Sequence, residues 1–109
     1  MSQVIYEVNV KIENSIFQAY LQWLQNHIRE MLEIKGFLSA TCYEEISDEF
    51  SANKGAQNTV CIHYILESKE ALQHYFEQHA ERMRADAVKN FGNKFSAWRR
   101  IMVKSRLNF

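Results

Sequence analysis

Proline is absent from all 109 residues, and glycine occurs only 3 times. Without proline, no X–Pro isomerisation can slow folding, and the chain holds neither a rigid linker nor a PxxP ligand segment. The 2 cysteines, Cys42 and Cys61, have neither CxxC spacing nor the dense, even pattern of a secreted disulfide scaffold. No apolar run approaches the roughly 18 residues that cross a membrane, and no signal-peptide pattern opens the sequence. These absences predict a reduced, cytoplasmic protein with no membrane partner.

The net charge is zero, because 13 basic and 13 acidic side chains cancel. The charges are distributed unequally along the chain. Residues 1–67 hold 4 basic and 9 acidic side chains, whereas residues 68–109 hold 9 basic and 4 acidic ones. The stretch 94–106 is basic without a single acid. Such asymmetry fits either self-association or an anionic partner. Overall neutrality and the lack of a nucleic-acid-binding motif favour self-association, so no nucleic-acid partner is expected.

Hydrophobic residues make up 47% of the chain, and their periodicity predicts its elements. Alternation predicts strands over residues 4–11, 37–46, 59–66 and 95–104, whereas helical spacing predicts helices over 16–34 and 69–91. Ser15 with Gln18 matches a capping box for the first helix, and Ser68 is the expected N-cap of the second. Gly36 and Gly92 stand where the two helices should end. The polar segment 47–56 is expected to be a long hairpin loop and the best candidate for a gating element.

The element order β-α-β-β-α-β predicts a single α+β domain over residues 1–109 with the ferredoxin-like fold. Right-handed crossovers place both helices on one face of a four-stranded antiparallel sheet with strand order 4-1-3-2. The opposite face would combine apolar side chains with Glu7, Asn9 and His63. This mixture is too apolar for solvent and too polar for a core, so we expect two copies to pack there as a homodimer.

Several segments resemble a small uncharacterised bacterial family of unknown function, related to the dimeric α/β-barrel proteins. The resemblance covers residues 4–103 and rests on Ile5-Tyr6-Glu7-Val8-Asn9-Val10, Trp23-x-x-x-His27-Ile28, Gly36-Phe37, Tyr75-x-x-x-His79-Ala80, Met83-Arg84 and Phe91-Gly92-x-x-Phe95-x-Ala97-x-Arg99. The chain departs from the family at Arg29 and Glu81, where the family tends to have proline. The resemblance implies a dimeric ferredoxin-like barrel but no activity. Wider relatives include antibiotic-biosynthesis monooxygenases, haem-degrading oxygenases and isomerases of lactone metabolism, a kinship that guides function only weakly.

Glu7 and His63 are the candidate catalytic pair, because adjacent strands place a carboxylate beside an imidazole on one face. The alternative is an ion pair buried at a dimer interface. Arg99 and Arg100 alternate, so one faces the sheet cavity, where it would hold a substrate carboxylate or pair with Glu7 or Glu45, and the other faces the helices. Cys61 is expected to be a small core filler.

A repeated stripe, Trp23-His27-Met31 and Tyr75-His79-Met83, offers two pocket-lining imidazoles. The alternative is that each histidine tethers a helix end. The expected ligand-binding residues are Tyr6, His27, Tyr43, His79, Trp98, Arg99 and Arg100. No histidine or cysteine spacing predicts a metal site, and no cofactor is expected.

Three functions remain open at this point, and whether the protein is an enzyme is not decided. The first is a homodimeric barrel that binds a small, partly apolar or aromatic molecule in a cavity between sheet and helices. The second is a cofactor-independent monooxygenase or isomerase acting on an aromatic or polyketide-like substrate, with Trp98, His63 and Glu7 lining one closed pocket. The third is a haem-binding protein with His27, His63 or His79 as axial ligand.

Overall fold

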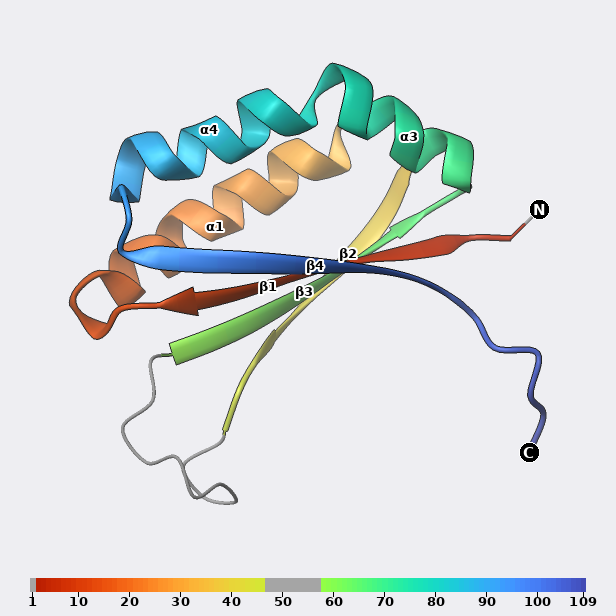
Figure 1. Cartoon of the computed structure of the whole chain (residues 1–109), viewed down its shortest axis with the longest axis horizontal. Helices are drawn as coiled ribbons and strands as arrows, with labels where there is room; N and C mark the ends of the chain where they lie inside the picture. The colour runs from red at the N-terminus through yellow and green to blue at the C-terminus, as the bar shows by residue number, and fades with distance from the viewer. Residues whose placement is uncertain (1, 47–57) are drawn as a thin grey trace.

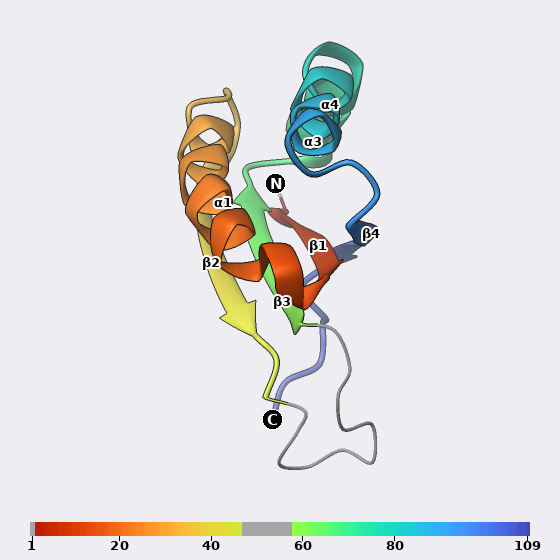
Figure 2. The same cartoon turned by 90° about the vertical axis from the view of Figure 1, so that its left-hand side faces the viewer.

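A computed structural model describes residues 2–46 and 58–109. The elements follow one another as β1 (Val4–Ile12), the short 3-10 turn η1 (Asn14–Ile16), α1 (Phe17–Leu32), β2 (Phe37–Glu44), β3 (Asn58–Leu66), α3 (Lys69–Gln78), α4 (Ala80–Phe91) and β4 (Phe95–Val103). The three α-helices of the described residues lie on one side of the sheet (Figure 1), with α1 beside the α3–α4 pair (Figure 2). The predicted α+β ferredoxin-like fold is confirmed.

The four strands form one antiparallel sheet in the order β2-β3-β1-β4, as predicted. The central strand β1 therefore has β3 on one side and β4 on the other. Glu7 lies opposite His63 on β3 and opposite Arg100 on β4. This register brings an acid from the acidic half of the chain against a base from the basic half.

The core lies between the sheet and the helices and consists of the side chains that alternation assigned to the helix-facing side. On β1 and β3 these residues are at most 2% exposed: Val4, Tyr6, Val10, Ile12, Val60, Ile62, Tyr64 and Leu66. Helical residues complete it, among them Tyr20, Leu24, Met31, Leu72, Tyr75 and Met83. The other sheet surface, here called the open face, is not covered by any of the described helices. It carries, at alternate positions, Ile5, Glu7, Asn9, Cys61, His63, Ile65, Tyr43, Trp98, Arg100 and Met102.

The predicted capping box at the first helix is wrong. The chain enters α1 through the 3-10 turn η1, and neither helical start has a side-chain cap, so Ser15 and Gln18 do not cap the helix. The prediction for Ser68 is confirmed, because its hydroxyl oxygen accepts a hydrogen bond from the Ala71 backbone N–H at 3.1 Å. Ser68 therefore satisfies one of the unpaired N–H groups at the start of α3.

The predicted single helix over residues 69–91 is two helices, α3 and α4, which meet at His79. The backbone there leaves the helical region, at φ −132° and ψ −30°. Buried positions explain the break, since Tyr75 and Ala80 are five residues apart rather than three or four. An unbroken helix would turn one of the two side chains away from the sheet, whereas the break lets both of them face it. The helix breaks at His79 even though Glu81 stands where the family that this sequence resembles tends to have proline.

Two glycines take positive φ angles where turns join the helices to strands. Gly92 ends α4 with φ +60°, as predicted, and Gly36 precedes β2 with φ +96°. The predicted hairpin loop and gating element at residues 47–56 lies outside the described residues. In the part of the chain that is described, no helix is long and apolar enough to span a membrane.

Candidate functional site

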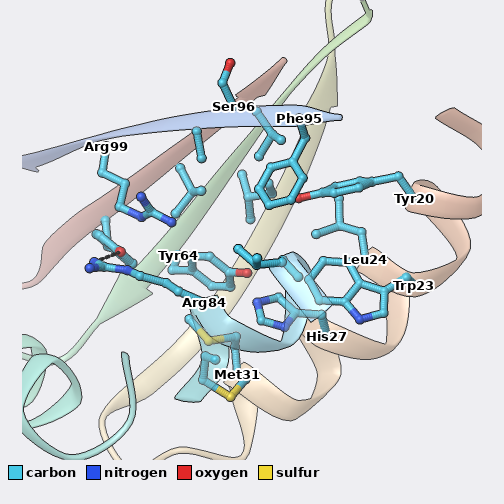
Figure 3. A pocket seen from close by; sticks show the side chains of 18 of the residues that line it. Tyr20, Trp23, Leu24, His27, Met31, Tyr64, Arg84, Phe95, Ser96 and Arg99 are labelled. Carbon is cyan, nitrogen blue, oxygen red and sulfur yellow. Dashed lines mark hydrogen bonds between the residues drawn. The ribbon is translucent and has the colours of Figure 1, made fainter. Parts of the chain in front are cut away.

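A pocket of about 320 Å³ lies between the helix-facing side of the sheet and the three-helix layer (Figure 3). Its size is at the lower end for small-molecule sites. It is lined by Tyr6, Val8, Val10, Tyr20, Trp23, Leu24, His27, Met31, Ile62, Tyr64, Tyr75, Met83, Arg84, Ala87, Val88, Gly92, Phe95, Ser96, Ala97 and Arg99. Aromatic and aliphatic side chains dominate this lining, with a few polar groups among them.

The aromatic walls of the pocket are held by ring contacts that cross between elements. Tyr20 on α1 packs on Trp23 with ring centres 5.3 Å apart, and on Phe95 of β4 at 5.5 Å. Tyr6 and Tyr64, from neighbouring strands, stack at 6.1 Å. Burial raises the pKa of Tyr20 to about 12, so its phenol stays protonated and polar without carrying charge. These walls suit a flat, apolar ring.

His27 is the polar side chain of the pocket with an unmet hydrogen bond. Its ring stacks on Trp23 at 4.5 Å between centres, and the Trp23 indole N–H donates to the Asp86 carboxylate at 3.2 Å. Its Nδ1 atom is buried and has no hydrogen-bond partner among the described residues. Burial lowers the pKa of His27 below its ordinary value, against an opposing influence from Asp86. A buried ring nitrogen without a partner costs free energy that a bound ligand can recover.

Two arginines, Arg84 of α4 and Arg99 of β4, bring positive charge to the pocket lining, which includes no acidic residue. Both side chains belong to exposed residues, so they lie where the pocket meets solvent. Arg84 donates to the Tyr6 hydroxyl oxygen at 3.2 Å. Both guanidinium groups also act on Tyr75, whose pKa burial nevertheless raises to about 12. The side chains of Arg84 and Arg99 lie at the same end of the pocket (Figure 3).

A second cluster lies on the open face around Glu7. The Glu7 carboxylate is 4% exposed and accepts two hydrogen bonds from Arg100, one from Nε and one from Nη2 at 3.1 Å. His63 Nε2 lies 2.9 Å from the same carboxylate, and Asn9 donates to it at 3.1 Å. Arg100, followed by His63, holds the pKa of Glu7 far below its ordinary value. This geometry is that of an ion pair, which was the alternative to a catalytic role for Glu7.

Cys61 completes the set of metal-ligand types at this cluster. Its thiol lies 3.5 Å from Glu7, and the ligand atoms of Glu7, Cys61 and His63 all lie within 4.8 Å of one another. However, Arg100 already uses both carboxylate oxygens. Burial, followed by the charge of Glu7, raises the pKa of Cys61 to about 11, so the thiol is protonated near neutral pH. This arrangement favours an ion-pair cluster over a cation site.

Residues 3–105 match the family described as Domain of unknown function (DUF4286). The chain belongs to this family. Its membership confirms the resemblance found in the sequence, and the family's description assigns it no activity. No curated protein matches the chain.

Solved structures similar to this DUF4286 chain share its fold at low sequence identity. A dimeric ferredoxin-like protein from an uncultured marine organism aligns with a TM-score of 0.72 at 7% identity, covering 100% of both chains. SnoaB, a cofactor-independent oxygenase from Streptomyces nogalater, aligns at 0.69 and 11% identity, covering 99% of this chain and 97% of its own. A putative antibiotic biosynthesis monooxygenase from Bacillus cereus aligns at 0.63 and 12% identity, covering 100% and 99%. At such identity the likeness shows the fold alone.

The residues predicted for one site divide between three places in this DUF4286 chain. Tyr6, His27 and Arg99 line the pocket. Glu7, His63, Tyr43, Trp98 and Arg100 lie on the open face, where the ring of Tyr43 meets that of His63 at 5.3 Å. His79 lies at the α3–α4 junction, where Arg82 approaches its Nδ1 at 3.3 Å, so the repeated histidine stripe does not place two imidazoles in one pocket.

The oxygenase hypothesis required Trp98, His63 and Glu7 to line one closed pocket, but among the described residues they do not line the pocket between sheet and helices. Trp98 is 48% exposed. Sequence reasoning in turn missed Tyr20, Tyr64 and Arg84 as lining residues. The tyrosines follow core periodicity and gave no separate signal. Arg84 directly follows Met83 of the stripe, and its place in the pocket lining could be predicted only together with the break between α3 and α4.

Proposed function

We propose that this protein binds a small, partly apolar molecule in the pocket between its sheet and helices, and that it acts as a homodimer. The observation that carries the binding proposal is the Nδ1 atom of His27, buried and unpaired in an aromatic-lined cavity. Buried polar groups in folded proteins are normally paired, so an exception at a pocket wall points to a missing partner. A ligand hydroxyl or amide meets that need.

The two tryptophans make the binding proposal directly testable. Trp23 lines the pocket and Trp98 lies on the open face, so their indole N–H resonances report on the two places separately. We expect 2-naphthamide, a neutral aromatic amide, to shift the Trp23 signal in a saturable way and to leave Trp98 unmoved. Val88→Phe narrows the pocket at an exposed lining residue and should weaken binding, whereas Lys89→Phe, next along α4, should not. Absence of any saturable Trp23 shift would overturn the proposal.

The homodimer proposal rests on the open face and on the fold. Apolar and aromatic side chains there remain exposed, with Tyr43 at 52% and Trp98 at 48%. The ion pair of Glu7 and Arg100 neutralises the centre of this face, so a second copy that covers the face does not bury an unpaired charge. The similar marine protein is described as dimeric.

A second candidate function is a cofactor-independent oxygenase or isomerase for an aromatic or polyketide-like substrate. His27 favours it, because its depressed pKa keeps the imidazole neutral, and the tautomer with hydrogen on Nε2 leaves Nδ1 free to accept a proton. The similarity to SnoaB points the same way. In the oxygenase case a CH2 group between two aromatic rings becomes a carbonyl with one oxygen atom of O2, and the second oxygen atom leaves with both hydrogens as water.

Oxygen uptake with anthrone tests this second candidate. Wild-type protein should consume O2 faster than buffer alone, and His27→Gln should fall back to the spontaneous rate. His74→Gln, an exposed histidine on α3, serves as the matched control and should keep the wild-type rate. Equal rates for buffer and wild type would remove the oxygenase candidate for this substrate.

The haem alternative has the least support. Two of the candidate axial ligands lie outside the pocket: His63 is hydrogen-bonded to Glu7, and His79 to Arg82. His27 is in the pocket, but its ring lies flat against Trp23 with 21° between the planes. The residues present do not fit an axial haem site.

A further inference from the structure

The two arginines of the pocket have no acidic partner. Within residues 2–46 and 58–109, every ion pair runs to Glu7, from His63 or from Arg100. Arg84 contacts the Tyr6 hydroxyl and lies 5.9 Å from the centre of the Phe76 ring. Arg99 makes no hydrogen bond to a described residue. Two cations at one end of a pocket, with no acid to neutralise them, would stabilise an anion bound there (Figure 3).

The arginines and the aromatic side chains occupy different ends of the pocket (Figure 3). Tyr20, Trp23 and Phe95 lie together at one end, and Arg84 and Arg99 at the other. The guanidinium groups belong to exposed residues, whereas Tyr20 is only 3% exposed. The pocket is thus apolar in its depth and cationic at its mouth.

We infer that the ligand is an aromatic carboxylate, with its ring among Tyr20, Trp23 and Tyr64 and its carboxylate at the mouth between Arg84 and Arg99. This inference rests on the proposed small-molecule binding and adds the charge and orientation of the ligand. A carboxylate at the mouth keeps part of its hydration, so the cost of burying a charge is avoided. Guanidinium groups match carboxylates in a planar, two-point geometry, which lysines would not provide.

The inference is tested by two ligands of nearly the same shape, 2-naphthoate and 2-naphthamide, which differ in charge. Each is titrated into the full-length protein, with the Trp23 indole N–H as the reporter and Trp98 as the off-site reference. We expect 2-naphthoate to bind more tightly, by about 2- to 5-fold for each exposed charge pair that it forms. Raising the salt concentration should reduce this preference, because the pairs lie at the surface.

Variants separate the arginines from general electrostatic attraction. Arg99→Gln should weaken 2-naphthoate about 2- to 5-fold and leave 2-naphthamide unchanged. Arg82→Gln removes the same charge from the same helix as Arg84, but outside the pocket, and should change neither ligand. Arg99→Lys should recover only part of the loss, because it restores charge without the planar donor pair.

The outcomes are distinct. If neither compound shifts Trp23, the proposed binding function itself fails. If 2-naphthamide binds as tightly as 2-naphthoate, or if Arg82→Gln weakens 2-naphthoate as much as Arg99→Gln does, the pocket binds apolar molecules and the inference about the carboxylate is wrong.

Discussion

At the scale of single residues, Glu7 shows how one carboxylate can join three strands. It sits on β1 and receives Arg100 from β4 and His63 from β3. Arg100 lowers the pKa of Glu7 most, and His63 adds to the effect. Because the folded-state pKa lies below the ordinary 4.5, Glu7 stabilises the fold fully above pH 4.5 and loses this contribution as the pH falls.

Glu7→Gln removes this charge at nearly constant shape. At pH 7 the free energy of unfolding should fall by about 1–2 kcal/mol, because charge-assisted hydrogen bonds are lost from a buried carboxylate. At pH 3 the difference from wild type should shrink, since the wild-type carboxylate is then losing its own contribution. Urea unfolding at both pH values, at one protein concentration, measures the change. Glu30→Gln, at an exposed position of α1, should have little effect at either pH. A gap of equal size at pH 3 would contradict the linkage.

His27 should titrate below its ordinary pKa of 6.5, because burial penalises the imidazolium. The unfolded chain then binds a proton that the folded chain does not, so His27 makes the protein less stable as the pH falls below 6.5. Asp86 opposes the shift. Asp86→Asn should therefore lower the pKa of His27 further, as read from its ring Cε1–H chemical shift against pH. An unchanged or raised value would show that Asp86 does not act on this ring.

The arginine pair shows what sequence could and could not establish at this scale. Alternation predicted that Arg99 and Arg100 face opposite sides of the sheet, and the pairing of Arg100 with Glu7 was one of the two roles considered. Alternation could not reveal that Arg84 of α4 would line the same pocket as Arg99 of β4. That placement depends on how α4 lies over the sheet, which no local pattern encodes.

At the scale of elements, two serines with similar sequence signals behave differently. Ser68 caps α3 through a hydrogen bond to Ala71, whereas Ser15 makes no capping bond. Ser68→Ala should lower the free energy of unfolding by about 1 kcal/mol. Ser15→Ala should leave it within a few tenths, and chemical unfolding of the two variants gives the comparison. Equal losses would mean that the capping bond is not the source of the stability.

The turn before β2 requires glycine for two separate reasons. Gly36 has φ +96°, and a Cβ added there would stand 2.5 Å from the Cβ of Ala71 on α3. Gly92 has φ +60° but nothing within 4 Å, so it serves as the matched comparison. Gly36→Ala should destabilise by about 2 kcal/mol or more, and Gly92→Ala by less, because only the backbone strain is shared. Thermal unfolding that ranks Gly92→Ala as the worse variant would contradict this account.

The elements themselves were largely predictable, since all four strands and their order follow from period-two alternation and right-handed crossovers. The break between α3 and α4 was not. The repeated stripe of Tyr75, His79 and Met83 has perfect helical spacing, but Ala80 is buried in place of its middle residue, His79. Which of two overlapping stripes faces the sheet is decided by packing against it, and sequence periodicity alone cannot choose.

At the scale of the whole molecule, the sheet has one covered side and one uncovered side. The helices bury the first, and the open face keeps Tyr43 and Trp98 about half exposed around the Glu7 cluster. A four-stranded sheet with exposed aromatic side chains gains stability by burying that area against a second copy. The predicted strand order also places basic β4 and acidic β2 at opposite edges, so an antiparallel pair of sheets brings unlike charges together.

The protein should therefore have a mass near twice 12.9 kDa at micromolar concentration, as measured by light scattering after size exclusion. Trp98→Asp places a charge in the open face and should shift the equilibrium toward the monomer, because an unpaired carboxylate is costly to bury. Ala85→Asp adds the same charge on the exposed side of α4 and should leave the dimer intact. Circular dichroism establishes whether each variant is folded. A folded wild-type monomer at these concentrations would refute the dimer, and a dimeric Trp98→Asp protein would mean that the copies meet elsewhere.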